Sequence, residues 1–246
     1  MHDIPEVFRF QSLDSTNSKL YEFMGNKHLT EFSAVIASEQ TAGRGQIGNS
    51  WESEKDKNLT FSIVLYPHFL KIQKQFRITQ MITTAITDVL CDLIPDISIK
   101  WPNDIYAGDK KIAGILIENS LSGPTISTTI VGIGLNVNQE VFISNAPNPT
   151  SMSLLTGVTY DLDVIFSQIR QAMVFRYIQW MEHGIRLIKK DYFKRLYRNE
   201  GYYLFSDANG RFKAKIYNIQ ESGHLLLIDI SGNHRAYAFK EVSFVM

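Results

Sequence analysis

Two strand-like runs in the middle of the chain restrict the fold more than any other feature. Residues 112–118 and 127–138 are rich in apolar and β-branched side chains, and only a short segment containing Gly123-Pro124 separates them. No helix fits between them, so the chain does not follow the strict strand–helix alternation of a parallel sheet. We therefore expect an α+β fold in which helices pack on one face of a mixed β-sheet.

The remaining elements follow from the spacing of apolar residues. Leu20, Phe23 and Met24 have helical spacing after Asp14 and Ser15, which are good N-cap residues. Further helices are expected at residues 69–93, 161–182 and 185–197. Strands are expected at 4–13, 34–37, 59–66 and 97–101, with a polar loop at 102–111 and an irregular segment at 139–160.

The character of the sequence changes near residue 200. Short β-rich runs in residues 202–246 are separated by turn sequences such as Ala208-Asn209-Gly210 and Ser231-Gly232-Asn233. Closely spaced turns between short strands are typical of a small β-barrel. We therefore expect two domains, residues 1–199 and residues 200–246.

The charge balance and the cysteine content exclude several classes of protein. The 246 residues include 25 Lys and Arg and 25 Asp and Glu, and the resulting net charge of zero disfavours DNA or RNA as the main partner. The single cysteine, Cys91, excludes an internal disulfide framework, and its apolar helical surroundings predict a buried thiol. The N-terminus lacks signal-peptide features, and no run of about 18 apolar residues occurs. We therefore expect a soluble, cytoplasmic protein with no membrane partner.

The glycine-rich segment at residues 39–51 is the first candidate for chemistry. Gly43, Gly45 and Gly48 expose backbone N–H groups, and Arg44 places a permanent positive charge among them. This combination suits a phosphate or a carboxylate. The segment lacks both the Gly-Lys-Ser/Thr ending of the common phosphate-binding loop and the dinucleotide fingerprint. Taken alone, it is equally compatible with a flexible hairpin.

Three further segments carry modest signals of the same kind. Lys-Trp-Pro-Asn-Asp at residues 100–104 is typical either of the rim of a site or of a strand end with an Asx turn. Lys111 begins a strand that contains Gly114, where a flat ligand can lie against the backbone, although a solvated hairpin end has the same pattern. Gly132 and Gly134 leave one face of a strand bare, which favours either a ligand slot or close strand packing.

Together, and in this order, these segments resemble the signatures of the biotin–protein ligases. The signatures are Ser-Thr-Asn at 15–17, Gln-Thr-Ala-Gly-Arg-Gly at 40–45 followed by a tryptophan, Lys-Trp-Pro-Asn-Asp at 100–104, Lys-Ile-Ala-Gly-Ile-Leu-Ile-Glu at 111–118 and Gly-Ile-Gly-Leu-Asn at 132–136. The resemblance covers essentially the whole chain. It implies the biotin–lipoate ligase catalytic fold, which is related to class II synthetases, followed by a small SH3-like β-barrel.

The resemblance implies a ligase reaction in two steps. The carboxylate of biotin attacks the α-phosphate of ATP to give biotinyl-5′-adenylate, and a lysine of a biotin carboxyl carrier protein or domain then displaces AMP. Positive charge is needed where the two anions meet, so the resemblance assigns catalytic roles to Lys111 and Arg44. It gives Asp104 the task of orienting or deprotonating the amine. Mg²⁺ would accompany ATP, with its protein ligands unassigned.

The same resemblance assigns the binding residues. Hydroxyl and amide side chains would pair with the ureido ring of biotin, and small residues would shape its slot. The residues implied for biotin are Ser15, Thr16, Gln40, Gly43, Arg44, Gly114, Leu116 and Gly132. The residues implied for ATP or the adenylate are Gly45, Gln46, Trp51, Asn103, Lys111 and Asn136. Among these, Asn136 would read the adenine edge and Trp51 would pack near the adenine.

The glycine loop departs from the family pattern. Many members continue it as Gly-Arg-Gly-Arg-Arg-Gly-Arg, whereas Gln46, Ile47 and Asn49 replace three of these arginines here. A charge-assisted hydrogen bond contributes about 1.5–3 kcal/mol. We therefore expect weaker retention of the adenylate, and intact chemistry because Arg44 and Lys111 remain.

Other functions and partners stay open at this point. A lipoate or octanoate ligase shares the ancestral fold, but its Arg-Arg-x-x-Gly-Gly signature is absent from the sequence. A non-catalytic biotin or nucleotide sensor would suit the altered loop but would not need Lys111 and Asp104. Repressor-type members carry a DNA-binding arm before the Ser-Thr-Asn segment, which begins here at residue 15, so we expect no DNA partner. Pairing of sheet edges would allow a homodimer.

Overall fold

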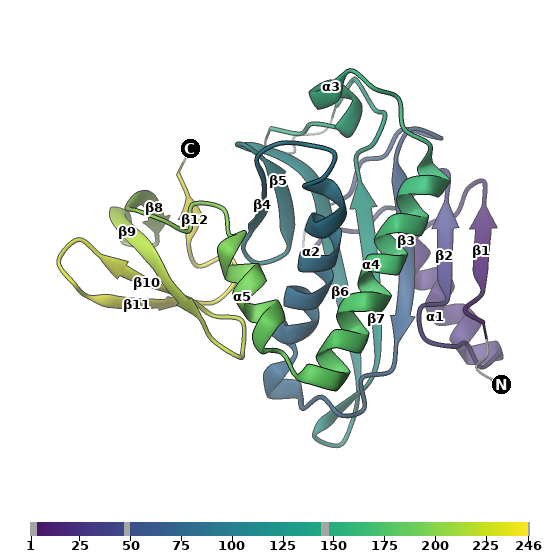
Figure 1. Ribbon diagram of the computed structural model, residues 1–246, viewed down its shortest axis with the longest axis horizontal. Helices are drawn as coiled ribbons and strands as arrows, with labels where there is room; N and C mark the ends of the chain where they lie inside the picture. Colours follow the sequence, from purple (N-terminus) through teal and green to yellow (C-terminus); the bar gives the residue numbers. More distant parts are fainter. Residues whose placement is uncertain (1–3, 47–49, 144–147, 246) are drawn as a thin grey trace.

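The computed structural model describes residues 4–46, 50–143 and 148–245 (Figure 1). The strands of its main sheet are β1 (Val7–Phe10), β2 (Ala34–Ala37), β3 (Leu59–Leu65), β4 (Ile97–Lys100), β5 (Asp104–Ala107), β6 (Lys110–Ser122) and β7 (Thr125–Leu135). Within the described residues they form one seven-stranded sheet in the order β1-β2-β3-β7-β6-β5-β4. β1 and β2 run parallel, and the other neighbouring pairs are antiparallel. The expected mixed sheet is confirmed.

Helices cover the two faces of this sheet unequally. They are α1 (Thr16–Asn26), α2 (Phe76–Leu90), α3 (Met152–Thr156), α4 (Leu162–His183) and α5 (Arg186–Lys194), with a 3₁₀ turn η1 (Ile72–Lys74) before α2. Figure 1 shows α2 and α4 lying across one face, where Phe61 meets Phe166 with 5.1 Å between ring centroids. On the opposite face, Leu20 of α1 packs in a smaller core with Val35 and Val64. The expectation of helices on one face holds for α2 and α4. It misses α1, which partly covers the opposite face.

Residues 102–111, expected to be a polar loop, contain β5 and the turn into β6. Ile105, Tyr106 and Ala107 are all buried, and Ile105 and Ala107 belong to the main hydrophobic core. Gly108, with φ of +54°, makes the tight turn that follows. The expectation was wrong because the buried run of β5 is only three residues long and is flanked by polar residues.

Three helical expectations also need correction. The helix expected at 69–93 is shorter, since α2 begins at Phe76 after η1 and ends at Leu90. Cys91 is exposed rather than buried, because Leu90 is the last fully buried residue of α2 and Cys91 lies just past the helix. The irregular segment 139–160 contains α3, whose N-cap Ser151 accepts a hydrogen bond from the Leu154 N–H.

No helix within the described ranges has the length and apolar character that a membrane span requires.

The chain after α5 forms a second sheet. Its strands are β8 (Tyr203–Asp207), β9 (Gly210–Ile219), β10 (Leu225–Asp229), β11 (His234–Tyr237) and β12 (Ser243–Phe244), paired in the order β11-β10-β9-β8-β12. This is the expected small β-rich module, although no pairing between β11 and β12 closes it into a barrel in the described residues. The module is fastened to the main sheet by Trp101, whose Nε1 donates to the Gly223 carbonyl at 2.8 Å.

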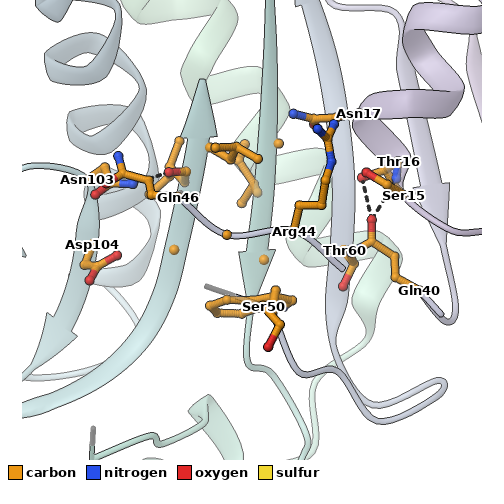
Figure 2. A pocket seen from close by; sticks show the side chains of 18 of the residues that line it. Ser15, Thr16, Asn17, Gln40, Arg44, Gln46, Ser50, Thr60, Asn103 and Asp104 are labelled. Atoms are coloured by element: carbon orange, nitrogen blue, oxygen red, sulfur yellow. Dashed lines mark hydrogen bonds between the residues drawn. The ribbon is translucent and has the colours of Figure 1, made fainter. Parts of the chain in front are cut away.

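The main strands turn different residues to their two faces. Phe61 of β3 and Ile133 of β7 are buried on the side of α2 and α4. On the other side, the register aligns Thr60, Gly134, Gly114 and Asp104 in one row across β3, β7, β6 and β5. Several side chains of this second face are drawn in Figure 2. Because successive side chains alternate between faces, small and polar residues gather on the side that the long helices leave open.

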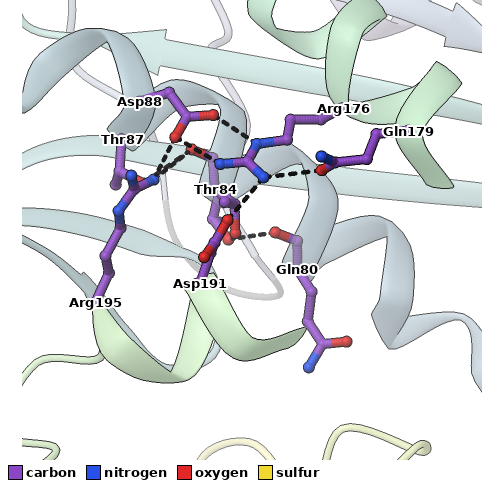
Figure 3. Close-up of polar contacts among 9 residues, drawn as sticks. Gln80, Thr84, Thr87, Asp88, Arg176, Gln179, Asp191 and Arg195 are labelled. Carbon is purple, nitrogen blue, oxygen red and sulfur yellow. Dashed lines mark hydrogen bonds and ion pairs between the residues drawn. The ribbon is translucent and has the colours of Figure 1, made fainter. Parts of the chain in front are cut away.

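A cluster of charges holds α2, α4 and α5 together (Figure 3). Arg176 of α4 donates to both oxygens of Asp88 in α2, at 2.7 and 2.8 Å, and to Asp191 of α5 at 2.7 Å. Arg195, just past α5, reaches Asp88 at 2.6 Å. Burial alone would raise the pKa of Asp88, but the hydrogen bonds from Arg176 and Arg195 outweigh burial and hold that pKa below its ordinary value. The cluster therefore stabilises the fold while Asp88 is ionised.

Replacement of Asp88 by Asn should lower the free energy of unfolding by about 1–3 kcal/mol near neutral pH, because Arg176 loses its two-oxygen partner. Since the folded-state pKa of Asp88 is lowered, this contribution is present above the unfolded pKa of about 4 and is lost as the pH falls through the folded value. Urea unfolding at several pH values measures both effects. The matched control is Asp92→Asn, an exposed aspartate just past α2. If the difference in the free energy of unfolding between the two variants did not decrease at acidic pH, the stabilising role of ionised Asp88 would be contradicted.

Candidate functional site

A pocket opens on the face of the main sheet that α2 and α4 leave uncovered. Its volume is about 110 Å³. The floor comes from β3, β7 and β6, and the walls come from the start of α1, the glycine loop, the β4–β5 turn and the turn between β11 and β12. The lining residues are Ser15, Thr16, Asn17, Gln40, Arg44, Gly45, Gln46, Ser50, Trp51, Thr60, Asn103, Asp104, Lys111, Gly114, Ile115, Leu116, Gly132, Ile133, Gly134 and Phe239.

One end of the pocket is a network of neutral polar groups, visible on one side of Figure 2. Gln40 Oε1 accepts from the Thr16 backbone N–H at 2.7 Å and from its hydroxyl at 3.1 Å. Below them, the Ser62 hydroxyl bonds to Thr16 at 2.7 Å and to Asn17 at 2.5 Å. Ser15, the N-cap residue of α1, is buried beside Thr16. This end can offer hydroxyl and amide groups in fixed directions to a neutral polar ligand.

The opposite end carries opposite charges in contact. Lys111 Nζ lies 2.7 Å from Asp104 Oδ1, and the two side chains are 23% and 26% exposed. Lys111 Nζ is also 5.8 Å from the centroid of the Trp51 ring. Lys111 is thus compensated within the protein, and an anionic ligand at this end would compete with Asp104 for its ammonium group.

Arg44 lies between the two ends, beside Asn17 in Figure 2. Its guanidinium pairs with Glu118 at 3.1 Å, and the Asn17 amide donates to the same carboxylate at 2.6 Å. The Arg44 and Glu118 side chains are 47% and 40% exposed, so this pair contributes little to stability. Arg44 can therefore exchange Glu118 for an anionic ligand at small cost.

The glycines of β6 and β7 make room for two side chains. A methyl group on Gly134 would lie 2.2 Å from the Trp51 indole, and one on Gly114 would lie 3.0 Å from it. A methyl group on Gly132 would lie 2.3 Å from Asn17 Oδ1. The bare strand face that the sequence suggested as a slot is therefore partly filled by Trp51 and Asn17. Trp51 thereby becomes a flat, apolar wall of the remaining space.

Three of the six buried side-chain polar atoms that lack a hydrogen-bond partner in the described residues belong to predicted site residues. Gln46 Oε1 and Trp51 Nε1 are buried without a hydrogen-bond partner in the described part of the chain, and both residues line the pocket. Asn136 Oδ1 is a third such atom. Buried polar atoms are nearly always paired with protein, water or ligand. A ligand that donates to Gln46 and accepts from Trp51 would remove this cost.

Most of the predicted site residues line the pocket, but Gly43 and Asn136 do not. Gly43 supports the wall, since its carbonyl accepts from the Trp51 N–H at 3.0 Å. The Asn136 amide is buried and donates to the Thr150 carbonyl at 2.9 Å. Ile47 and Asn49, the other altered positions of the glycine loop, lie outside the described residues.

Several lining residues were missed by sequence reasoning. They are Asn17, Ser50, Thr60, Ile115, Ile133 and Phe239. Thr60 could have been found from the alternation of its strand, since it pairs with Gly134 on the face of Gly132. Phe239 had no local signal, because it lies in the turn between β11 and β12 and reaches the pocket only through the docking of the second sheet.

The described residues contain no group of three or more His, Cys, Asp or Glu side chains that could hold a metal ion. The acidic groups nearest the pocket, Asp104 and Glu118, each contact a cation instead. A divalent cation at this site would therefore have to bring most of its ligands with it, as Mg²⁺ does when it is bound to phosphates.

Comparison with known families fits this geometry. The model of the Biotin/lipoate A/B protein ligase family matches residues 7–136, which is more than half of the chain. The chain belongs to this family.

Individual relatives align over most of the chain. The bifunctional ligase/repressor BirA of Bacillus subtilis is 30% identical over 235 residues, which cover 92% of this chain and 70% of the relative. The biotin–[acetyl-CoA-carboxylase] ligase of Paracoccus denitrificans is 28% identical over 221 residues, covering 87% and 90%. The solved biotin protein ligase of Aquifex aeolicus, in complex with biotin and ATP, has a TM-score of 0.80 at 24% identity and covers 98% of each chain. The last comparison establishes the fold.

A Gly134→Ala variant should displace Trp51, because the added methyl group would lie 2.2 Å from the indole ring. We expect increased quenching of tryptophan fluorescence by acrylamide. The increase should vanish when Trp51 is also replaced by Phe, since Trp101 and Trp180 remain buried. Gly25→Ala is the control, because nothing lies within 4 Å of its added methyl group. Unchanged quenching in Gly134→Ala would show that Trp51 does not occupy the bare strand face.

Proposed function

We propose that this protein is an ATP-dependent biotin–protein ligase, which forms biotinyl-5′-adenylate and then transfers biotin to a lysine of a carrier protein. One observation carries the proposal. In a chain of this family, the Lys111–Asp104 pair stands at one end of a pocket whose other end presents neutral hydroxyl and amide groups. A substrate with a polar, uncharged ring and a carboxylate on an apolar chain matches that distribution. The relatives named as biotin ligases support the choice of biotin.

Binding of biotin would use the neutral end of the pocket. Ser15, Thr16 and Gln40 would pair with the ureido group, whose N–H and C=O groups lose water on entry. Gly114, Leu116 and Gly132 would border the rings and the valeryl chain, and Gly43 would keep the loop closed behind them. The carboxylate would then lie toward Lys111.

The first chemical step joins two anions. A carboxylate oxygen of biotin attacks the α-phosphorus of ATP, the bond to the β-phosphate breaks, and pyrophosphate leaves with the electron pair. Lys111 and Arg44 would lower the repulsion between the reactants by exchanging Asp104 and Glu118 for substrate oxygens. Gly45, Gln46 and Asn103 would border the phosphate region. Trp51 and Asn136 would contact the adenine side, and Mg²⁺ would enter bound to the ATP phosphates.

The second step transfers the acyl group to an amine. The lysine ammonium of the carrier loses a proton, its nitrogen attacks the biotinyl carbonyl, and AMP leaves as the amide forms. Asp104 would hold the ammonium group and accept its proton, since its carboxylate faces the pocket beside Lys111.

The proposal extends to partners and organisation. The acceptor would be a biotin carboxyl carrier protein or domain of a biotin-dependent carboxylase, as the name of the Paracoccus relative suggests. The catalytic unit would be residues 1–199, with residues 200–246 as the second domain that supplies Phe239. We further propose a cytoplasmic ligase that does not act through DNA or a membrane. β6 pairs with β5 only as far as Gly114. The edge of its remaining residues, 115–122, would be the surface for homodimerisation.

Lys111→Met should reduce biotin-dependent ATP–pyrophosphate exchange by about 10²- to 10³-fold, because the charge that neutralises the reacting anions is lost. Lys110→Met, which changes the exposed lysine beside it, is the matched control and should keep nearly full activity. Exchange is assayed with Mg²⁺, without carrier, and with octanoate and lipoate as alternative acids. Exchange with octanoate or lipoate but not biotin would assign the protein to the other branch of the family. Biotin binding without exchange would make it a sensor.

Gln46→Arg should slow release of the adenylate by about 10- to 100-fold, which corresponds to one charge-assisted contact of about 1.5–3 kcal/mol. Gln46 lines the pocket and has an unpaired buried oxygen, so an arginine there would reach the bound phosphate. The release rate is measured from preformed, radiolabelled adenylate complex. Gln75→Arg, placed outside this pocket, is the control. An unchanged release rate in Gln46→Arg would remove the explanation of the altered loop.

A further inference from the structure

Lys100 is a half-buried lysine beside Lys111 and Asp104, and neither step of the proposed reaction uses it. It ends β4 and is the register partner of Asp104 across the β4–β5 hairpin. Its ammonium donates to the Tyr106 hydroxyl at 2.9 Å and lies 4.3 Å from the centroid of that ring. The rings of Phe244 and Tyr197 lie 5.6 and 5.7 Å away. In the described residues it has no carboxylate within ion-pair distance.

This position is costly for a positive charge. Burial lowers the pKa of Lys100, and the attraction of Asp104 offsets burial only in part. Burial also raises the pKa of the Tyr106 phenol, so Tyr106 stays neutral and serves only as a hydrogen-bond acceptor for Lys100. A methionine at position 100 would fill the same space among the aromatic rings, and it would carry no charge that has to be removed from water. The charged groups that act on Lys100 from the surrounding elements are Asp104, Lys111, Arg198 and Asp109.

The proposed reaction leaves Asp104 short of a cation. In the free protein, Asp104 is compensated by Lys111 at 2.7 Å. Each phosphate or carboxylate oxygen that Lys111 binds weakens this compensation, and the phosphate adds negative charge near Asp104. A carboxylate that loses its cation and gains an anionic neighbour holds its proton more tightly. A second cation beside Asp104 would counter this effect at the stage where the incoming amine gives up its proton.

We infer that Lys100 is a positioning residue for the transfer step, whose charge keeps Asp104 ionised while Lys111 is engaged by the adenylate. This inference rests on the proposed function and adds a residue to it. Lys100 does not line the pocket, and its ammonium faces Tyr106 and Phe244, so direct contact with substrate is not its role. It acts through the field that it exerts on its register partner.

The test separates charge from packing by comparing Lys100→Met with Lys100→Arg. Adenylate formation is measured as biotin-dependent ATP–pyrophosphate exchange. Transfer is measured in single turnovers from the preformed adenylate complex to Nα-acetyl-lysine methylamide across a range of pH. Hydroxylamine serves as a second acceptor, because it is already neutral near pH 7 and needs no base. Thermal unfolding of each variant checks the fold.

Lys100→Met should leave exchange within about twofold of the wild type. Removal of a nearby cation raises the pKa of a carboxylate, so the acidic limb of transfer to the lysine amide should move to higher pH by about one unit. On that limb the loss of rate is about tenfold, whereas the plateau and transfer to hydroxylamine change little. Lys100→Arg should restore the wild-type limb.

Three results would overturn the inference. The first is an unmoved acidic limb in Lys100→Met. The second is an equal loss of exchange and of transfer to both acceptors, which would indicate a phosphate contact or a structural anchor. The third is a limb that stays shifted in a folded Lys100→Arg variant. If the wild type itself shows no biotin-dependent exchange, the proposed function has failed instead, so the two failures are distinguishable.

Discussion

Alternation of side chains along β3, β6 and β7 is the constraint on which both the core and the pocket depend. In β7, Val131 and Ile133 are buried in the main core, whereas Gly132 and Gly134 lie under Asn17 and Trp51. A slip of one residue would exchange the two faces. It would put glycines into the core and branched side chains where Trp51 now lies. The backbone register that stabilises the sheet therefore also determines the shape of the pocket.

The charges of the pocket are held as internal pairs. Lys111 contacts Asp104, and Arg44 contacts Glu118, so both cations are already paired in the absence of a ligand. An anionic substrate exchanges partners with these carboxylates, and its affinity reflects the difference between two sets of contacts rather than the full strength of one. The exchange also leaves a carboxylate available, which is the form that an acceptor ammonium requires.

Local sequence signals sufficed where structure is set locally. The strand at 34–37 is recovered, because an apolar run acts within a few positions. Ser15 holds the expected N-cap position of α1, although its side chain makes no capping hydrogen bond. The contact between Lys111 and Asp104 was not recovered. It arises from antiparallel pairing of β5 with β6, and β5 lies in the segment taken for a loop. Phe239 joins the site through tertiary packing, which leaves no mark on neighbouring residues.

The position of Phe239 late in the chain determines when the pocket can be completed during synthesis. The other lining residues lie between positions 15 and 134, and Phe239 follows them by more than a hundred positions along the chain. A ribosome makes the chain from its N-terminus, so the residues of the floor and of most of the walls are synthesised well before this ring. An emerging chain thus has an unfinished pocket until the second sheet has been made and has docked through Trp101. Ligand binding that depends on Phe239 consequently requires a chain in which the second sheet has been synthesised and has docked.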